Sequence, residues 1–232
     1  MVETGARKRV GQIGRTAMSA REQILGRVRS ALADVTDPDV TETPVHWTYG
    51  ATVDTGDLGL VDRFAERVAD YRATVEQVAA SAVGGAVARA LAGHDTVLAD
   101  TGLRQQLGID LPWVDDTDLS TAELDTIAAV VTTAAIGIAN TGTIVLDHGP
   151  GQGRRAASLV PDVHVCIVSV DQIVSDVPEA VARLIASGSP ARPQTWISGP
   201  SATSDIELDR VEGVHGPRTL HVIIAGGPGG QP

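Results

Sequence analysis

The chain has 232 residues, of which 43% are hydrophobic and 20% are charged. A chain of this length and composition can bury a large core, which excludes an intrinsically disordered protein. Aromatic residues make up only 3% of the chain and the net charge is −11. Such a chain offers few rings for stacking on bases and repels a phosphate backbone, so we expect no nucleic-acid partner.

The longest apolar run covers residues 127–139. It is too short to cross a bilayer, which takes about 20 apolar residues. The basic start of the chain is not followed by the apolar segment of a signal peptide. We therefore expect a cytoplasmic protein with no membrane partner.

The start of the chain differs in composition from the rest. Residues 1–17 show no periodicity and hold four basic residues and one acidic residue, so we expect a disordered tail, with Met18 as an alternative start of the protein. Ser19 and Glu22 have the spacing of a capping box, and apolar residues then recur at helical intervals, which predicts a helix over 20–33. We interpret residues 18–57 as this helix and a linker rich in Asp, Thr, Pro and Gly.

An α/β domain is predicted over residues 58–227, followed by a frayed terminus at 228–232. Its first part has a helix over 59–72, a strand over 74–78, a helix over 80–92 and a strand over 96–99. Further apolar runs lie at 127–131, 135–139, 143–147, 164–170, 195–198 and 219–225. Helical patterns fill 153–160, 177–187 and 203–211.

This alternation of strands and helices predicts a central, largely parallel sheet flanked by helices. The runs 135–139 and 143–147 are separated by only three residues, Asn140-Thr141-Gly142. We interpret them as an antiparallel hairpin inserted in that sheet.

Two glycine-containing loops are candidate anion sites. Asn140-Thr141-Gly142-Thr143 is either a hairpin turn or a cradle of amides and hydroxyls for an anion. His148–Arg155 carries glycines at 149, 151 and 153 before the predicted helix, where free amides and the helix dipole favour an anion. Arg154 and Arg155 add two guanidinium groups suited to a carboxylate or phosphate. The alternative interpretation of this segment is a flexible turn with two surface arginines and no ligand.

Two later loops could complete such a site. Ser198–Glu207 ends a strand and enters a predicted helix, so its hydroxyls either cap that helix or bind a polar ligand, with a carboxylate available for acid–base work. In Gly213–Arg218 a histidine stands between glycines, with an arginine that could join the anion site. The candidate ligand-binding residues of all four loops are Asn140, Thr141, Gly142, Thr143, Gly151, Gly153, Arg154, Arg155, Gly199, Ser201, Thr203, Asp205, Glu207, His215 and Arg218.

The sequence lacks the usual patterns of metal-binding and redox sites. Cys166 is the only cysteine, so the chain alone can form neither a disulfide nor a cysteine-ligated iron–sulfur cluster. It lies in a predicted strand, where we expect a buried and inert thiol. The histidines have no metal-binding spacing, so we expect no metal site and no cofactor held by this chain.

Several segments together resemble a known family. The matching segments are 139–147, Gly153-Arg154-Arg155, 160–166, 198–207 and 213–218. They are similar to the LUD domain, and more closely to the lactate utilisation protein C family. The likeness covers residues 95–227 well and the helix at 20–33 more loosely.

The resemblance implies a fold like that of the NagB/RpiA/CoA-transferase group and a role in oxidising L-lactate to pyruvate. It also implies iron–sulfur partner proteins that carry the electrons, which fits the single cysteine of this chain. Members often have Glu where this sequence has Asn140. If that Glu were a catalytic base or nucleophile, this chain would lack it, and the catalytic residues are left unassigned.

Two functions remain open at this point. The first is a non-redox component of a lactate-oxidising system that binds a small anionic ligand or a partner. The second is a stand-alone enzyme on the same scaffold, acting as a CoA-transferase, a sugar-phosphate isomerase or an ATP-dependent ligase. The resemblance and the lone cysteine favour the first.

Overall fold

The computed structural model describes residues 19–34, 51–188, 192–203, 211–212 and 216–226, and the chain divides into two units, Met1–Trp47 and Thr48–Pro232. The described part of the first unit is helix α1 (Ala20–Ala31). The Ser19 Oγ accepts from the Glu22 amide at 3.2 Å, and the Glu22 carboxylate accepts from the Ser19 amide at 2.7 Å. The predicted capping box and helix are therefore confirmed. The tail expected over 1–17 and the end expected over 228–232 lie outside the described residues.

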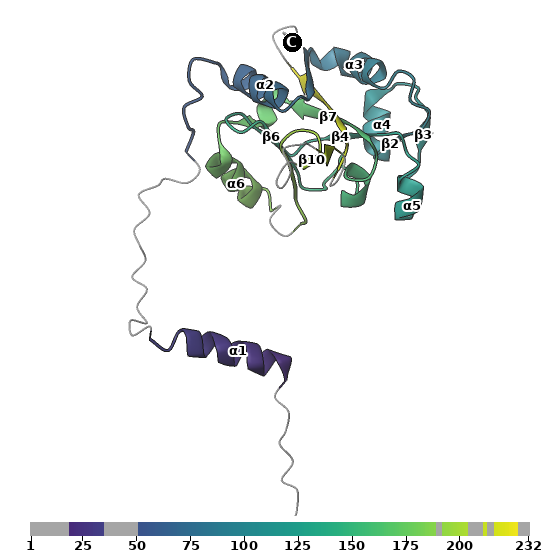
Figure 1. Ribbon diagram of the computed structural model, residues 1–232. Coiled ribbons are helices and arrows are strands. Elements are labelled where there is room, and N and C mark those ends of the chain that lie inside the picture. The colour runs from purple at the N-terminus through teal and green to yellow at the C-terminus, as the bar shows by residue number, and fades with distance from the viewer. Residues whose placement is uncertain (1–18, 35–50, 189–191, 204–210, 213–215, 227–232) are drawn as a thin grey trace, which may run out of the picture. The chain divides into compact units, whose positions relative to one another are not determined.

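The second unit is built on a six-stranded sheet (Figure 1). Its order is β1-β12-β7-β4-β2-β3, and every neighbouring pair is parallel, which confirms the predicted central sheet. The strands are β1 (Thr74–Val78), β2 (Val97–Ala99), β3 (Trp113–Val114), β4 (Ala129–Thr133), β7 (Val163–Ser169) and β12 (Thr219–Ala225).

The predicted hairpin forms, but outside the central sheet. β5 (Ile136–Ile138) and β6 (Thr143–Leu146) pair antiparallel and join β8 (Ile173–Val174) and β9 (Thr195–Ile197) in a second sheet of order β8-β5-β6-β9. All residues of β5 and β6 are buried. Their alternate side chains serve two cores, because Ile144 packs toward the central sheet while Val145 packs toward α6. A layer that is apolar on both faces is stable between other layers, which explains the separate sheet.

Helices complete the layers on both sides of the central sheet. α3 (Val83–Ala90) and α4 (Thr101–Leu107) cover one face, where they pack on Val131 and Val165. α2 (Leu60–Asp70) and the second sheet cover the other face, and α6 (Val177–Ala186) packs on the second sheet. The helices predicted over 59–72, 80–92 and 177–187 are confirmed, the second of them beginning as a 3₁₀ turn, η1 (Ala80–Ala82).

Two predicted helices are wrong in whole or part. The segment 153–160 contains only a 3₁₀ turn, η2 (Arg155–Ser158), because Gly151 and Gly153 adopt positive φ and the chain cannot enter an α-helix there. The helix predicted over 203–211 fails at both ends, which lie in the short antiparallel strands β10 (Ala202–Thr203) and β11 (Val211–Glu212). Its middle, residues 204–210, lies outside the described residues.

Short elements between β2 and β4 were not predicted. They are α4, β3 and α5 (Thr121–Leu124), and a further 3₁₀ turn, η3 (Val170–Gln172), leads into β8. Strands of two residues and helices of one or two turns carry too little periodicity for a sequence pattern. Among the helices in the described part of the chain, none is long and apolar enough to cross a membrane.

Candidate functional site

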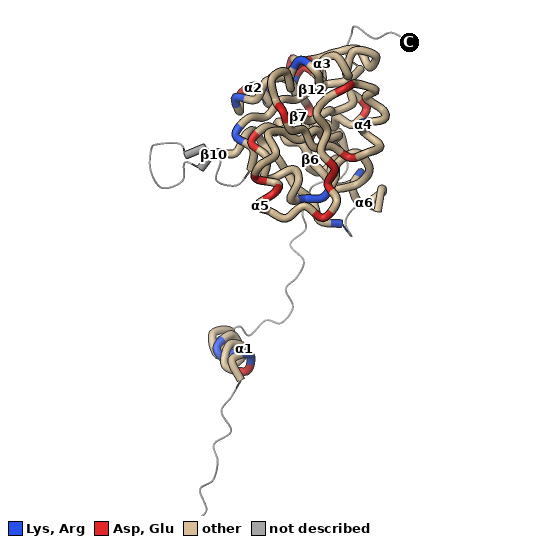
Figure 2. The backbone as a smooth tube through the Cα atoms, turned by 90° about the vertical axis from the view of Figure 1, so that its right-hand side faces the viewer, with Lys and Arg blue, Asp and Glu red and all other residues tan. Residues whose placement is uncertain are grey.

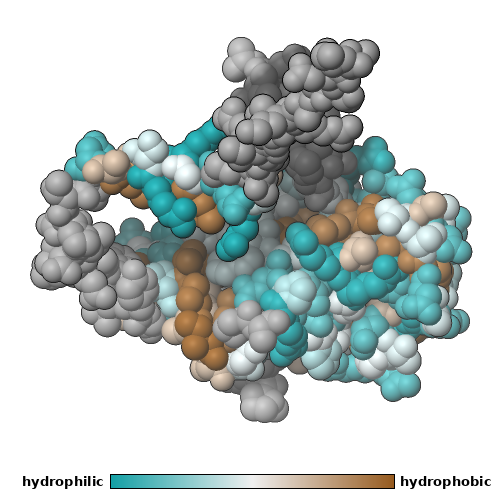
Figure 3. Space-filling view, turned by 90° about the horizontal axis from the view of Figure 1, so that it is seen from below, coloured by the Kyte–Doolittle hydropathy of each residue, from teal (hydrophilic) through white to brown (hydrophobic). Residues whose placement is uncertain are grey.

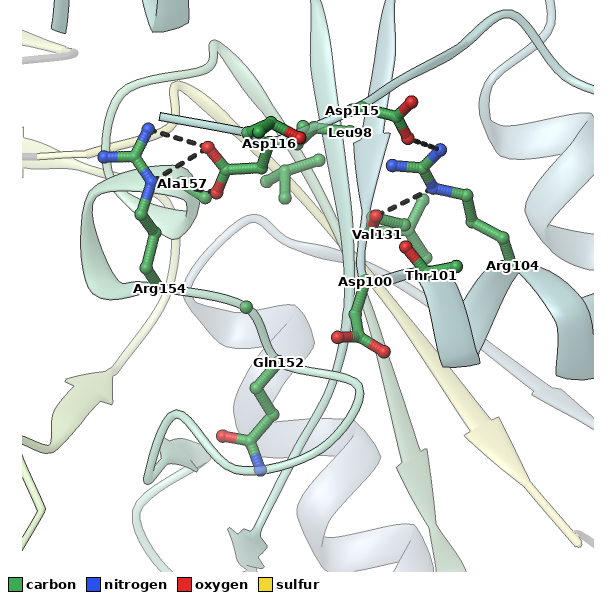
Figure 4. Close-up of a pocket in the computed structure, with 14 residues that line it drawn as sticks. Leu98, Asp100, Thr101, Arg104, Asp115, Asp116, Val131, Gln152, Arg154 and Ala157 are labelled. Carbon is green, nitrogen blue, oxygen red and sulfur yellow. Dashed lines mark hydrogen bonds and ion pairs between the residues drawn. The ribbon is translucent and has the colours of Figure 1, made fainter. Parts of the chain in front are cut away.

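The order of the central strands places a crevice between β2 and β4. The chain passes from β2 to the edge strand β3, returns to β4, and then continues to β7 in the opposite direction across the sheet. In open α/β sheets, ligands bind at the carboxyl ends of the strands where this direction reverses. A cavity of about 310 Å³ lies at this position (Figure 4). Residues with polar side chains in its lining are Asp100, Thr101, Arg104, Asp115, Asp116, Thr117, Gln152 and Arg154.

One side of the cavity is organised by Arg104. Its Nε donates to the Ala99 carbonyl at 2.8 Å and its Nη2 to the Val114 carbonyl at 2.6 Å, which ties together the ends of β2 and β3. Its Nη1 donates to Asp115 at 2.7 Å. Asp100 caps α4 by accepting from the Gly102 amide at 2.9 Å through Oδ1. With all three of its nitrogens committed, Arg104 shapes the cavity rather than offering donors to a ligand.

The other side of the cavity is formed by Arg154. Its Nε lies 2.8 and 2.9 Å from the two carboxylate oxygens of Asp116, and its Nη2 donates to the Leu119 carbonyl at 2.6 Å. The hydrogen bond that Arg154 donates to Asp116 is the main cause that raises the pKa of Arg154 above its ordinary value. The side chain is thus a permanently cationic group held at the rim, and Nη1 takes part in neither of these hydrogen bonds.

A buried polar network holds the glycine-rich loop that delivers Arg154. The Gln152 side chain accepts from the Asp147 and His148 amides at 2.8 and 3.0 Å, and donates to the Asp147 carboxylate at 2.9 Å. The imidazole of His148 bridges to the Thr195 hydroxyl at 2.9 Å. Gln152 is buried, so this loop is a rigid turn rather than a flexible one.

The two adjacent arginines of the predicted site are separated by the structure. Gly153 and Arg154 line the cavity, whereas Arg155 begins η2 with an exposed side chain and is not among the lining residues. The loop leads into the single 3₁₀ turn η2 and not into the predicted α-helix, so no helix dipole of that length faces the loop. The close approach of this loop to β4 requires a glycine at position 151, because a Cβ there would lie 2.8 Å from the Thr133 hydroxyl.

The loop 140–143 is a turn whose polar groups bind one another. Asn140 donates to the Asp54 carbonyl at 3.1 Å and to Asp176 at 3.3 Å. Thr141 donates to Thr143 at 2.8 Å. Thr143 in turn lies 2.8 Å from the Ser198 hydroxyl. These contacts favour the hairpin-turn interpretation over the anion cradle.

Part of the remaining predicted set lines a second cavity of about 250 Å³. It brings Gly199 and Ser201 together with Gly216, and the Ser201 amide donates to the Pro217 carbonyl at 2.8 Å. Arg218 lies beside Asp162 instead, with an Nε to Oδ1 distance of 2.9 Å. Thr203 lies in β10. Asp205, Glu207 and His215 lie outside the described residues.

His164 of β7 lies against this second cavity and is fully buried. Its Nε2 lies 2.8 Å from the Thr132 hydroxyl, while its Nδ1 has no hydrogen-bond partner among the described residues. Burial lowers the pKa of His164 to about 4, so the ring is neutral at physiological pH.

The thiol of Cys166 is buried in β7 beside Thr132. The Thr132 hydroxyl also approaches the Cys166 Sγ at 3.6 Å, and burial raises the pKa of this thiol to about 12. The thiol is therefore protonated and unreactive, as expected from its place in a strand. Over residues 19–34 and the described parts of 51–226, no cluster of three or more His, Cys, Asp or Glu side chains could hold a metal ion.

Sequence reasoning missed the acidic half of the first cavity. Asp100 directly follows the predicted strand 96–99, which was a usable sign, since loops after parallel strands carry ligands. Asp115 and Asp116 follow β3, a strand of two residues that no periodicity revealed. The residues missed here are Asp100, Arg104, Asp115 and Asp116.

Comparison with known proteins gives consistent matches. The sequence profile of the LUD domain matches residues 115–225. Lactate utilization protein C of Deinococcus radiodurans is 48% identical over 175 residues, which are 72% of this chain and 80% of that protein. Lactate utilization protein C of Anoxybacillus flavithermus is 31% identical over 163 residues, covering 67% of this chain and 70% of that protein.

A solved structure agrees with these sequence matches. The crystal structure of a DUF162 family protein from Deinococcus radiodurans superposes with a TM-score of 0.64 at 40% identity. The match covers 75% of this chain and 99% of that one. The α/β architecture described above is therefore also the architecture of a natural relative.

Proposed function

Because this chain belongs to the lactate utilization protein C family of LUD-domain proteins, we propose that it acts in the oxidation of lactate to pyruvate as a component without a redox centre of its own. The family name supports the role in lactate utilisation. The buried, protonated Cys166 supports the second part, since cysteine-ligated iron–sulfur clusters need several thiolates. In this proposal the electrons pass to iron–sulfur partner proteins.

The cavity between β2 and β4 is the proposed ligand site, and the placement of Arg154 at its rim is the observation that carries this assignment. A guanidinium group recognises a carboxylate through charge-assisted N–H donors. Asp116 and Leu119 engage the Nε and Nη2 of Arg154, so Nη1 is the nitrogen that it offers to a ligand, and Asp116 fixes the direction of the group. The volume of about 310 Å³ accommodates a small hydroxy acid together with water.

Asp100 supplies the complementary group for a hydroxyl. Its Oδ1 accepts from the start of α4, and its carboxylate lies in the cavity wall (Figure 4). In this proposal Asp100 accepts from a hydroxyl of the ligand through Oδ2, while Arg154 meets a carboxylate, directly or through water. We therefore expect a ligand that carries both groups, as L-lactate does.

The proposal is tested by isothermal titration of the full chain with L-lactate. We expect Arg154→Ala to weaken binding by at least tenfold, since a charge-assisted hydrogen bond is worth about 1.5–3 kcal/mol. Arg155→Ala is the matched control, because it removes the same side chain one residue away and outside the cavity. Equal binding by the two variants would refute the assigned site.

The role in the cell is tested separately by growth on L-lactate. A strain lacking the gene should fail to grow on lactate as sole carbon source. Wild type and Arg155→Ala should restore growth, and Arg154→Ala should not. Growth of the deletion strain without a second copy of the gene would refute the lactate role, and lactate-dependent dye reduction by the purified chain alone would refute the non-redox assignment.

A further inference from the structure

Helix α1 carries an apolar stripe that no other described residue of its own unit covers. Ile24, Leu25, Val28 and Leu32 are 61%, 37%, 49% and 56% exposed. At 100° per residue these four positions fall within about 100° of the helix circumference, which is the width of a buried face in an amphipathic helix. None of the residues 20–31 is buried. An exposed stripe of this kind indicates a surface that the helix meets with one side.

Basic side chains flank the stripe on both edges. Arg27 lies about 60° before Ile24 on the helix circumference, and Arg29 about 40° beyond Leu25. Arg21 lies over the N-terminal end of the stripe, where its long side chain can bend aside and keep its charge in water. Glu22 lies about 60° beyond Leu25, close to Arg29, and the opposite side of the helix holds Gln23 and Ser30.

The charge of the chain is divided between its two parts. Residues 1–33 contain seven basic and two acidic residues, a net charge of +5, whereas residues 34–232 contain 11 basic and 27 acidic residues, a net charge of −16. Figure 2 shows acidic positions spread over the second unit, and blue arginine positions along α1. A basic segment of this kind is attracted to strongly anionic surfaces.

We propose that α1 lies on the surface of an anionic lipid membrane. An apolar stripe flanked by arginines enters the boundary between headgroups and acyl chains, while the arginines meet lipid phosphates. The additional basic residues at 7–9 and 15 would strengthen attraction to an anionic leaflet. Attachment of this kind to a membrane surface requires no spanning segment.

An anionic membrane repels the acidic second unit, and the length of the linker allows this unit to stay away from the membrane surface. Covalent geometry allows the 18 residues 33–50 to reach up to about 60 Å. At physiological salt, charges are screened beyond about 8 Å. The acidic domain can therefore remain in solution while α1 is bound.

The test is co-sedimentation of the full chain with vesicles. Wild type should bind vesicles of equal parts phosphatidylcholine and phosphatidylglycerol, should not bind phosphatidylcholine alone, and should dissociate as sodium chloride is raised from about 50 to 500 mM. Binding of both vesicle types alike would overturn the electrostatic part of the proposal. Absence of binding to the anionic vesicles would overturn it altogether, and the stripe would then be a docking face for a protein groove.

Two variants with the same added charge locate the contact. Val28→Asp places a carboxylate in the middle of the stripe, whereas Ser30→Asp places one on the opposite side of the same helix turn. We expect Val28→Asp to reduce vesicle binding at least tenfold and Ser30→Asp by no more than about threefold. Equal losses would refute binding through the stripe. The pair Arg27→Gln/Arg29→Gln, which leaves the stripe intact, should reduce binding to anionic vesicles and its salt dependence.

Discussion

Arg154 and Arg155 illustrate how strongly the surroundings of a residue decide its role. Both follow the same glycine-rich loop, and nothing in the sequence separates them. Arg154 meets Asp116 and Leu119, which come from a segment about 35 residues earlier, and so becomes a fixed cation at a cavity rim. Arg155 has no such partner in the described chain and points to solvent. The comparison of their alanine variants is therefore informative because the pair is chemically matched.

The burial of His164 predicts how the free energy of unfolding depends on pH. Its pKa is about 4 in the folded protein and near 6.5 when exposed, so between these values the unfolded chain binds a proton that the folded chain does not. The free energy of unfolding is therefore unaffected by this group above about pH 7 and falls as the pH drops from 6.5 toward 4. At pH 4.5 the loss should be about 2–3 kcal/mol.

Urea unfolding of wild type and His164→Gln at pH 7.5 and 4.5 measures this loss. The glutamine can still hydrogen-bond to Thr132 but does not titrate, and other titrating groups contribute equally to both proteins. We expect the drop between the two pH values to be smaller in the variant by about 2–3 kcal/mol. The same drop in both proteins would show that His164 becomes protonated without cost.

At the scale of elements, the β5–β6 hairpin depends on a close approach to α2. Gly142 in the turn has a φ of +61°, and a Cβ there would lie 2.8 Å from the backbone of Arg67. Gly153 has a nearly equal φ of +66°, but a Cβ there would meet no atom within 4 Å. The two glycines thus share one conformational demand and differ in the space around them.

This difference gives a matched pair of substitutions. Gly153→Ala should cost about 1–2 kcal/mol in the free energy of unfolding, the usual penalty of a left-handed conformation. Gly142→Ala should cost clearly more, because the hairpin or α2 must also move away. Thermal or urea unfolding decides between these expectations, and equal costs would show that the contact relaxes freely.

At the scale of the whole molecule, the chain carries a strong excess of acidic charge, and the face seen in Figure 3 mixes polar and apolar side chains. Like charges on a compact domain repel one another and lower its stability, and salt screens that repulsion. The ion pairs of the described structure join mostly exposed groups, such as Arg218 with Asp162, and surface pairs of this kind contribute little.

Raising sodium chloride from about 20 to 300 mM should therefore increase the melting temperature. A gain of about 1 kcal/mol corresponds to roughly 2–4 °C for a protein of this size. Choline chloride at the same ionic strength should produce the same shift if screening is the cause. A fall in melting temperature would mean that the ion pairs outweigh the net repulsion.

The sequence by itself determined the elements whose side-chain patterns are long. The helices at 20–31, 60–70 and 177–186 and the strands of the central sheet other than β3 follow from local periodicity, which depends only on neighbouring residues. The family likeness also belongs to this level, because motifs such as Gly153-Arg154-Arg155 are read directly from the chain. Segments of two to seven residues between β2 and β4 escaped prediction, since a strand of two residues or a helix of one or two turns has no clear period.

Only the tertiary structure decided where the hairpin packs and which side chains meet. The second sheet exists because β5 and β6 are apolar on both faces, and a local pattern does not say which layers will cover them. The candidate residues of the loops divided between a turn, two cavities and a surface ion pair. Contacts such as that of Arg154 with Asp116 join residues distant in sequence, and their geometry arises only when the strands that carry them are placed side by side.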